Sequence, residues 1–201
     1  ERALLSGSVF VTLYHIYVAV GTGLSLLQGR VLHVFAFLGL WFLFQLVKGT
    51  RSKTRNLYLV AMLIIVLVSG FYFFTQTAPM TLLDKGIWGI NTADVVFGIL
   101  LMLIILEVSR QAVGPALPVI AVAFVLYAIA GPHLPDVIAH KGYDLGYITS
   151  YVAWTSEGIF GTPVGAATSF VVLYIVFGEL LDQFGAGRFF IDIAYALTGR
   201  L

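Results

Sequence analysis

Long apolar segments follow one another through most of the chain, and their length limits what it can fold into. A helix needs about 20 mostly apolar residues to cross a membrane, because it rises about 1.5 Å per residue. Six segments meet or approach this length: residues 4–27, 31–47, 57–75, 93–113, 115–131 and 164–181. We therefore expect an all-α integral membrane protein with about six transmembrane helices and additional interfacial amphipathic helices.

The charge content supports this expectation. Charged residues make up 10% and hydrophobic residues 60% of the 201 residues, whereas an ordinary soluble domain has roughly 25% charged residues. The chain thus has too few charges to cover a soluble surface. Its net charge of +1 gives no indication of a nucleic-acid partner, which needs a basic patch. The sequence contains no cysteine, which excludes thiol catalysis, thiolate metal sites and disulfide bonds.

Several helix starts can be predicted from their capping residues. Asn91 can cap the fourth span, with Asp94 in the favourable first turn. Thr162 before Pro163 is typical of an N-cap followed by the first helical residue, and Asp144 can cap a helix beginning at residue 145. Segments 145–158 and 188–197 are amphipathic, so we expect the first to be interfacial or re-entrant and the second to lie at the interface.

The basic residues predict the orientation of the chain. The loop at residues 48–55 holds four cations and no anion: Lys48, Arg51, Lys53 and Arg55. Such a loop marks the cytoplasmic side. Counting spans from it places the N-terminus, Arg110 and the tail after residue 181 inside. The outer loops are then residues 28–30, 76–92 and 132–144.

Glu107 and Arg110 are charged residues within a predicted span. Their i, i+3 spacing puts them on one face of the helix, and charges inside a membrane are usually paired. We interpret them as an intramembrane ion pair near the cytoplasmic end of the fourth span. A role in a proton or substrate relay remains the alternative.

Residues 157–165 interrupt the helical pattern, because three glycines and a proline lie within them. Broken helices in transporters expose backbone groups that can bind ions or substrates. A structural hinge that leads into the sixth span is the simpler interpretation. The residues of this broken-helix segment are Glu157, Gly158, Gly161, Thr162, Pro163 and Gly165.

Other catalytic and metal patterns are weak. The sequence has no HExxH, GxSxG or Walker A motif. His133 and His140 lie in one outer loop, but a metal site needs three or four convergent ligands, so we predict no metal site and no catalytic residue. An intramembrane enzyme would have to use His15 and Glu107, the only candidates for a catalytic pair at depth.

From Leu106 onward, many short motifs in order resemble the fused membrane component of TRAP (tripartite ATP-independent periplasmic) transporters of the TAXI type. They are Leu106-Glu-Val-Ser-Arg110, Pro118-Val-Ile-Ala, Leu126-Tyr-Ala, Gly131-Pro-His-Leu-Pro135, His140-Lys-Gly-Tyr143, Glu157-Gly-Ile-Phe-Gly161, Phe177-Gly-Glu-Leu-Leu181, Gly185-Ala-Gly187, Phe189-Phe-Ile-Asp192-Ile-Ala194 and Leu197-Thr-Gly-Arg200. Gln111 departs from the family pattern, in which a second basic residue follows Arg110. The first four spans resemble the small four-helix domain of this family in layout only.

The resemblance implies a secondary transporter in the bacterial or archaeal cytoplasmic (inner) membrane. Such a transporter uses a sodium or proton gradient to import an organic anion or amino acid, which a periplasmic binding protein delivers. The resemblance also implies a small membrane domain at residues 1–113, and a connecting helix with the start of the large transport domain at 114–201. Substrate-binding residues are expected beyond Leu201, in the remainder of the large domain. No cofactor is expected in residues 1–201.

Two further expectations follow. The outer loops 76–92 and 132–144 are candidates for docking the binding protein, with Lys85 and Lys141 as rim charges. The main alternative function is a structural membrane assembly subunit without a transport role.

Overall fold

The computed structural model describes residues 2–21, 24–49 and 52–199, and these residues contain helices but no strands. Arg51 of the predicted cationic loop, and Arg200 and Leu201, lie outside the described residues. The helices are α1 (Arg2–Val20), α2 (Leu26–Lys48), α3 (Lys53–Gln76), α4 (Pro79–Trp88), α5 (Thr92–Ala112), α6 (Ala116–Ala130), a 3₁₀ turn η1 (Gly131–His133), α7 (Leu145–Trp154), α8 (Thr162–Ala166), a π-helical turn η2 (Ala167–Val171), α9 (Val172–Gln183) and α10 (Ala186–Thr198).

The all-helical membrane architecture is confirmed. Five helical segments are long and apolar enough to cross a membrane: Leu26–Lys48, Lys53–Gln76, Thr92–Ala112, Ala116–His133 and Thr162–Gln183. Each corresponds to a predicted span. The remaining predicted span, residues 4–27, corresponds to α1, whose apolar part is only the shorter segment Leu4–Val18.

The predicted boundary between the first two spans is wrong. The first helix ends at Val20 instead of continuing to residue 27, and Gly21 adopts φ 101°. Ser25 then caps α2 through a capping box with Gln28. Residues 28–30 are therefore helical, and Arg30 lies one turn inside α2 instead of in an outer loop. Gly21 and the pattern Ser25-x-x-Gln28 indicate this boundary in the sequence, but the prediction followed the absence of charged residues from 4 to 27 instead.

The other capping predictions are mostly confirmed. Asn91 caps α5 in a reciprocal capping box with Asp94, and Asp144 caps α7 through the backbone N–H of Tyr147. The prediction for α8 is shifted by one residue, because Gly161 is the N-cap and Thr162 already belongs to the helix. The predicted outer loop 76–92 also contains a helix, α4.

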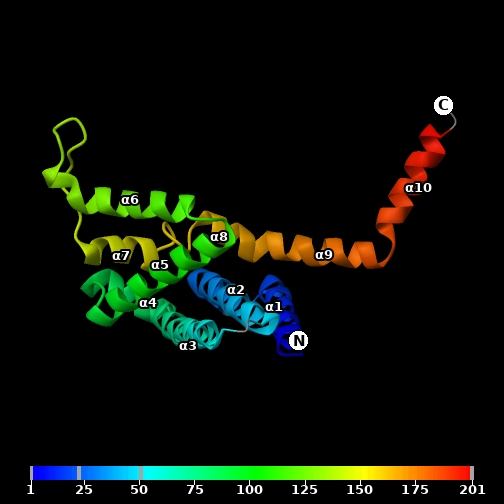
Figure 1. The fold of residues 1–201 in the computed structure, drawn as a ribbon, viewed down its shortest axis with the longest axis horizontal. Coiled ribbons are helices and arrows are strands. Elements are labelled where there is room, and N and C mark those ends of the chain that lie inside the picture. Colours follow the sequence, from blue (N-terminus) through cyan, green and yellow to red (C-terminus); the bar gives the residue numbers. More distant parts are fainter. Residues whose placement is uncertain (1, 22–23, 50–51, 200–201) are drawn as a thin grey trace.

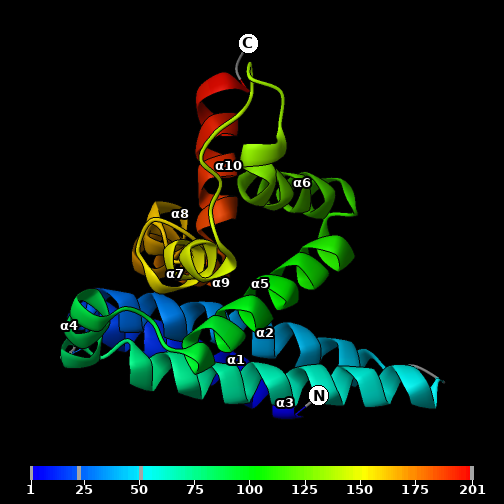
Figure 2. The ribbon, with the colours of Figure 1, turned by 90° about the vertical axis from the view of Figure 1, so that its left-hand side faces the viewer.

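The helices form two layers that cross at a steep angle. Helices α2 and α3 lie side by side and are seen lengthwise in Figure 2, where α7 and α9 are seen nearly end-on. Figure 1 shows α6, α7 and α9 lengthwise instead. Helix α5 contacts α3 in one layer and α6 and α7 in the other. It therefore links the two layers.

One apolar core joins the layers. Its buried side chains come from α2, α3, α5, α7 and the loop after α7, and they include Phe42, Leu59, Phe73, Leu101, Trp154 and Phe160. Residues on both sides of the predicted domain boundary at 113/114 thus contribute to the same core. That boundary stays a prediction.

The chain ends in two helices that leave this core. We call α1–α5, α7 and α8 the helix bundle, and α9 with α10 the C-terminal arm. In Figure 1 the arm extends away from the bundle, and α10 turns sharply from α9. Within the described residues of α9 and α10, no side chain is buried. The predicted helix at 188–197 is confirmed as part of α10, whereas its place at a membrane interface stays a prediction.

Candidate functional site

Asp94 is the centre of a buried polar cluster at the start of α5. Its side chain is 0% exposed and forms an ion pair with Lys85 of α4. Its Oδ1 accepts a hydrogen bond from the Tyr72 hydroxyl at 3.0 Å, and its Oδ2 accepts one from the Asn91 N–H at 2.9 Å. The Trp154 indole N–H donates to the Asp94 carbonyl at 3.0 Å. This one residue therefore connects α3, α4, α5 and α7.

Aromatic rings surround this ion pair. Lys85 Nζ lies 4.7 Å from the centre of the Trp154 ring, and Trp154 stacks on Phe73. Tyr72 stacks on Phe97 with ring centres 4.1 Å apart. The rings exclude water from the ion pair, which strengthens its electrostatic attraction. The sequence identified Asp94 as a capping residue but missed this cluster, because Tyr72, Lys85 and Trp154 each lie on a different helix from Asp94.

Lys85 differs from the exposed rim charge expected at a docking surface. Its side chain is only 10% exposed and its ammonium is paired with Asp94. Lys141 is exposed, and its Nζ lies 5.0 Å from the centre of the Tyr143 ring. A docking role for the two lysines stays a prediction, but Lys141 alone has the accessibility that such a role requires.

The broken-helix segment is a structured turn that brings Arg30 to the backbone. The chain leaves helical structure after Trp154 and re-enters it at Thr162. The Ile159 N–H donates to the Val152 carbonyl at 2.8 Å, and a side chain at Gly158 would collide with the backbone of Val152. Arg30 Nη1 donates to the Phe160 carbonyl at 2.7 Å. The break thus exposes a carbonyl oxygen that binds a cationic side chain of α2.

Two glycines of this segment have separate roles. Gly161 caps α8. Gly165 lies against the Arg30 guanidinium, since a Cβ there would be 2.6 Å from Nη2. Pro163 stands in the first turn of α8, where its missing N–H is tolerated. No ion pair or side-chain hydrogen bond of Glu157 occurs among the described residues, and its backbone N–H donates to Thr155.

Glu107 and Arg110 form the predicted ion pair near the other end of α5. Arg110 Nε and Nη2 each donate to the Glu107 carboxylate at 2.8 Å. The Tyr58 hydroxyl of α3 donates to the same carboxylate at 2.9 Å, and the Gln111 amide does so at 2.7 Å. The exposed fractions are 57% for Arg110 and 27% for Glu107. The pair therefore connects α3 to α5 from a partly open position.

His15 and His33 form a buried pair that the sequence did not reveal. His15 Nε2 lies 2.8 Å from His33 Nδ1, and His15 Nδ1 lies 2.7 Å from the Val11 carbonyl. A carbonyl only accepts hydrogen bonds, so His15 carries its proton on Nδ1. In a neutral pair, His33 then donates from Nδ1 to His15 Nε2. Because His15 and His33 lie on consecutive helices, the sequence could have indicated that they meet. The wrong helix boundary at residues 28–30 hid the fact that they lie at the same level of α1 and α2.

Two alternatives from the sequence concern histidines: a catalytic pair of His15 with Glu107, and a metal pair of His133 with His140. His15 and Glu107 belong to separate hydrogen-bond clusters, so the pair needed by an intramembrane enzyme is not assembled. Both ring nitrogens of His140 are engaged by backbone groups, at Tyr127 and Gly142. The residues described contain no group of three potential metal ligands.

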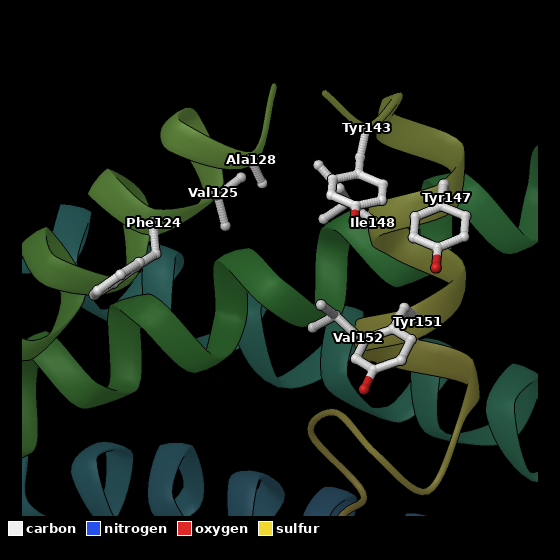
Figure 3. A pocket seen from close by; sticks show the side chains of 8 residues that line it. All are labelled: Phe124, Val125, Ala128, Tyr143, Tyr147, Ile148, Tyr151 and Val152. Carbon is white, nitrogen blue, oxygen red and sulfur yellow. The ribbon is translucent and has the colours of Figure 1, made fainter. Parts of the chain in front are cut away.

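A cavity of about 480 Å³ lies between α6 and α7. Figure 3 shows Phe124, Val125 and Ala128 projecting from α6, opposite the side chains of the α7 region. The latter are Tyr143, Tyr147, Ile148, Tyr151 and Val152. Its lining contains no charged side chain, so it can hold an apolar group but offers no fixed charge to orient an anion.

Comparison with known protein families identifies a relationship for the C-terminal half of the chain. The family model described as "Tripartite ATP-independent periplasmic transporter, DctM component" matches residues 100–201, just over half of the chain. The match covers the C-terminal part of α5 and everything after it, including Glu107, Arg110 and the broken-helix segment. No curated protein and no solved structure matches the chain significantly.

Proposed function

The chain belongs to the family of the DctM component of tripartite ATP-independent periplasmic transporters, and on this premise we propose that residues 2–199 act mainly as a stationary membrane scaffold. The complete transporter uses a sodium or proton gradient to import an organic anion or amino acid. A periplasmic binding protein delivers the substrate. The resemblance of the sequence motifs to the fused TAXI type supports these finer assignments.

The use of polar groups within the bundle supports the scaffold role. A transport site near the middle of a membrane needs polar side chains or helix ends that converge on the substrate. Here two sets of buried polar side chains bind one another across helices: Asp94 with Lys85 and Tyr72, and His15 with His33. Such contacts fix helices in place. The substrate and coupling-ion sites therefore lie outside residues 2–199.

The scaffold proposal predicts constant distances inside the bundle during transport. Because the natural chain has no cysteine, spin labels can be attached at single cysteines replacing Thr54 of α3 and Tyr151 of α7, which are both exposed. In the complete transporter, the distance distribution should be the same with and without sodium and loaded binding protein. A distribution that shifts with these ligands would show that α3 and α7 move relative to each other and would refute the scaffold role.

Reconstitution separates the scaffold from a transport unit. Liposomes containing only residues 1–201, with loaded binding protein and an imposed sodium or proton gradient, should take up no more substrate than empty liposomes. Gradient-dependent uptake would overturn the proposal. The assembly-subunit alternative requires that the complete chain, tested in the same way, also fails to transport.

The orientation can be tested on the same cysteine-free background. Cysteines replacing Ser52 and Lys141 should react with an impermeant reagent from opposite sides of the membrane, with residue 52 on the cytoplasmic side. The four cations at residues 48–55 support this placement. Labelling of both cysteines from one side would refute the predicted alternation of spans between them. Labelling of residue 52 from the periplasmic side would refute the cytoplasmic N-terminus.

A further inference from the structure

Arg30 is a cation within a membrane-spanning helix that has no anionic partner in the described structure. It is the fifth residue of α2, and the ion pairs formed by the described side chains involve only Lys85 with Asp94 and Arg110 with Glu107. A charged side chain in a transmembrane segment is costly and is usually paired. Unlike Lys85 and Arg110, Arg30 therefore retains an uncompensated charge.

The guanidinium is nevertheless held in a fixed place. Nη1 donates to the Phe160 carbonyl at 2.7 Å, and the group lies against Gly165 of α8. The Nε–H is buried without any hydrogen-bond partner. A planar guanidinium has five N–H donors in a rigid fork, and the one carbonyl uses only one of them. The remaining donors are pre-oriented for an acceptor with several oxygens.

Arg30 borders two cavities that give access to it. The larger, about 460 Å³, is also lined by Ser25, Leu26, Leu82, Trp154 and Ser156. The smaller, about 280 Å³, includes Gly165 and the hydroxyl residues Thr168 and Ser169. Both cavities thus combine one cation and hydroxyl groups with apolar side chains. Their walls contain no carboxylate that would repel an anion.

From this geometry we propose that Arg30 and the cavity beside it bind a phosphate group. An Arg fork matches the oxygens of phosphate in a bidentate manner. The positive end of the α2 dipole, at Leu26 and Leu27, adds to the attraction. The phosphate can belong to the headgroup of an anionic phospholipid or to a free phosphate ion. The exposed apolar side chain of Leu26 at the cavity fits the lipid source, whose glycerol and acyl groups would contact it.

Lipid binding to the purified protein tests the site. We expect phosphatidylglycerol in mixed micelles to raise the unfolding temperature more than phosphatidylcholine does, since a ligand of the folded state stabilises it. Arg30→Gln should remove this difference and lower the affinity for phosphatidylglycerol about tenfold or more, as expected for lost charged hydrogen bonds. Arg188→Gln in α10, the same charge change at an exposed residue, should retain the wild-type response.

A second pair of variants keeps Arg30 in place. Leu26 is 68% exposed, so substitutions there leave the core intact. Leu26→Glu places a carboxylate beside Arg30 and should abolish the preference for phosphatidylglycerol. Leu26→Gln, whose side chain has the shape of Glu, loses the same apolar contact without adding a charge and should keep more of that preference than Leu26→Glu does. If Arg30→Gln fails to fold, this pair still decides the question. Equal responses of the Glu and Gln variants would refute the proposal.

Inorganic phosphate identifies the source of the phosphate group. An Arg30-dependent stabilisation by phosphatidylglycerol but not by inorganic phosphate assigns the site to a lipid headgroup. The same stabilisation by inorganic phosphate alone assigns it to a free anion, and both results support phosphate binding. Responses to both probes that are unchanged in Arg30→Gln and in Leu26→Glu would overturn it.

Discussion

The helix bundle and the C-terminal arm use similar apolar sequences in opposite ways. In the bundle, glycines and small residues bring helices close together, and buried polar groups such as Asp94 and His15 bind across helices. In the arm, no described side chain of α9 or α10 is buried, although α9 contacts α1, and the Gln183 amide donates to Glu179 four residues earlier. Apolar sequence alone therefore allows a helix to enter a membrane, whereas small and polar residues at specific positions make it part of a packed protein.

The largest expected difference between the two regions concerns buried charge. Asp94→Leu leaves the Lys85 ammonium without its partner, which should lower the free energy of unfolding by about 3–5 kcal/mol. The matched change in the arm, Asp192→Leu at an exposed residue of α10, should have little effect. Thermal unfolding in detergent measures both.

A second substitution checks the cause. Lys85→Met combined with Asp94→Leu removes both charges and should recover much of the loss, because no unpaired charge remains buried. If Asp94→Leu is no more destabilising than Asp192→Leu, the buried cluster does not hold the bundle together.

Close packing gives the next largest difference. A Cβ at Gly98 of α5 would lie 2.3 Å from the Thr149 methyl of α7, whereas one at Gly178 of α9 would meet nothing within 4 Å. Gly98→Ala should therefore cost about 1–3 kcal/mol through overpacking, while Gly178→Ala should cause no loss. Thr149→Ser removes the opposing methyl and should restore stability to Gly98→Ala. Equal effects of the two glycine substitutions would remove this distinction between the regions.

The histidine pair should have a smaller effect. His33→Leu removes the hydrogen bond that His33 donates to His15 Nε2. Hydrogen bonds between helices in membranes contribute about 0.6 kcal/mol on average to the free energy of unfolding. The double variant His15→Leu with His33→Leu should be close to the single variant or more stable, since no imidazole is left unsatisfied. Gln183→Leu in the arm serves as the control and should be neutral. A double variant much less stable than either single variant would contradict this account.

The smallest effect is expected at the open end of α5. Glu107→Gln breaks the pair with Arg110, but water can solvate the partly exposed groups, so stability should fall less than in His33→Leu. Adding Arg110→Gln should recover the loss. A Glu107→Gln variant of the complete transporter that folds normally yet loses ion coupling would instead favour the relay interpretation.

Local patterns in the sequence were sufficient for most helices. Length and apolarity identified the five long helical segments, and Asn91 and Asp144 marked two helix starts, because a cap depends only on residues within one turn. The ion pair of Glu107 and Arg110 was predictable for the same reason, since both lie on one helix face. The predicted boundary between the first two spans was wrong because the local signals at Gly21 and Ser25 competed with a long segment, residues 4–27, that has no charged residue.

The contacts between helices could not be predicted from the sequence. The partners of Asp94 come from residues as far apart as Tyr72 and Trp154, and Arg30 meets Phe160 across 130 positions of the chain. Apolar helices with little amphipathic character do not specify which face meets which neighbour. That choice depends on where small residues such as Gly98 and Gly165 permit close approach. The length and apolarity of the chain's segments are thus sufficient to identify a helical membrane protein. The pairing of Asp94 with Lys85, and the placing of Arg30 against a carbonyl oxygen instead of an anion, depend on how the helices pack.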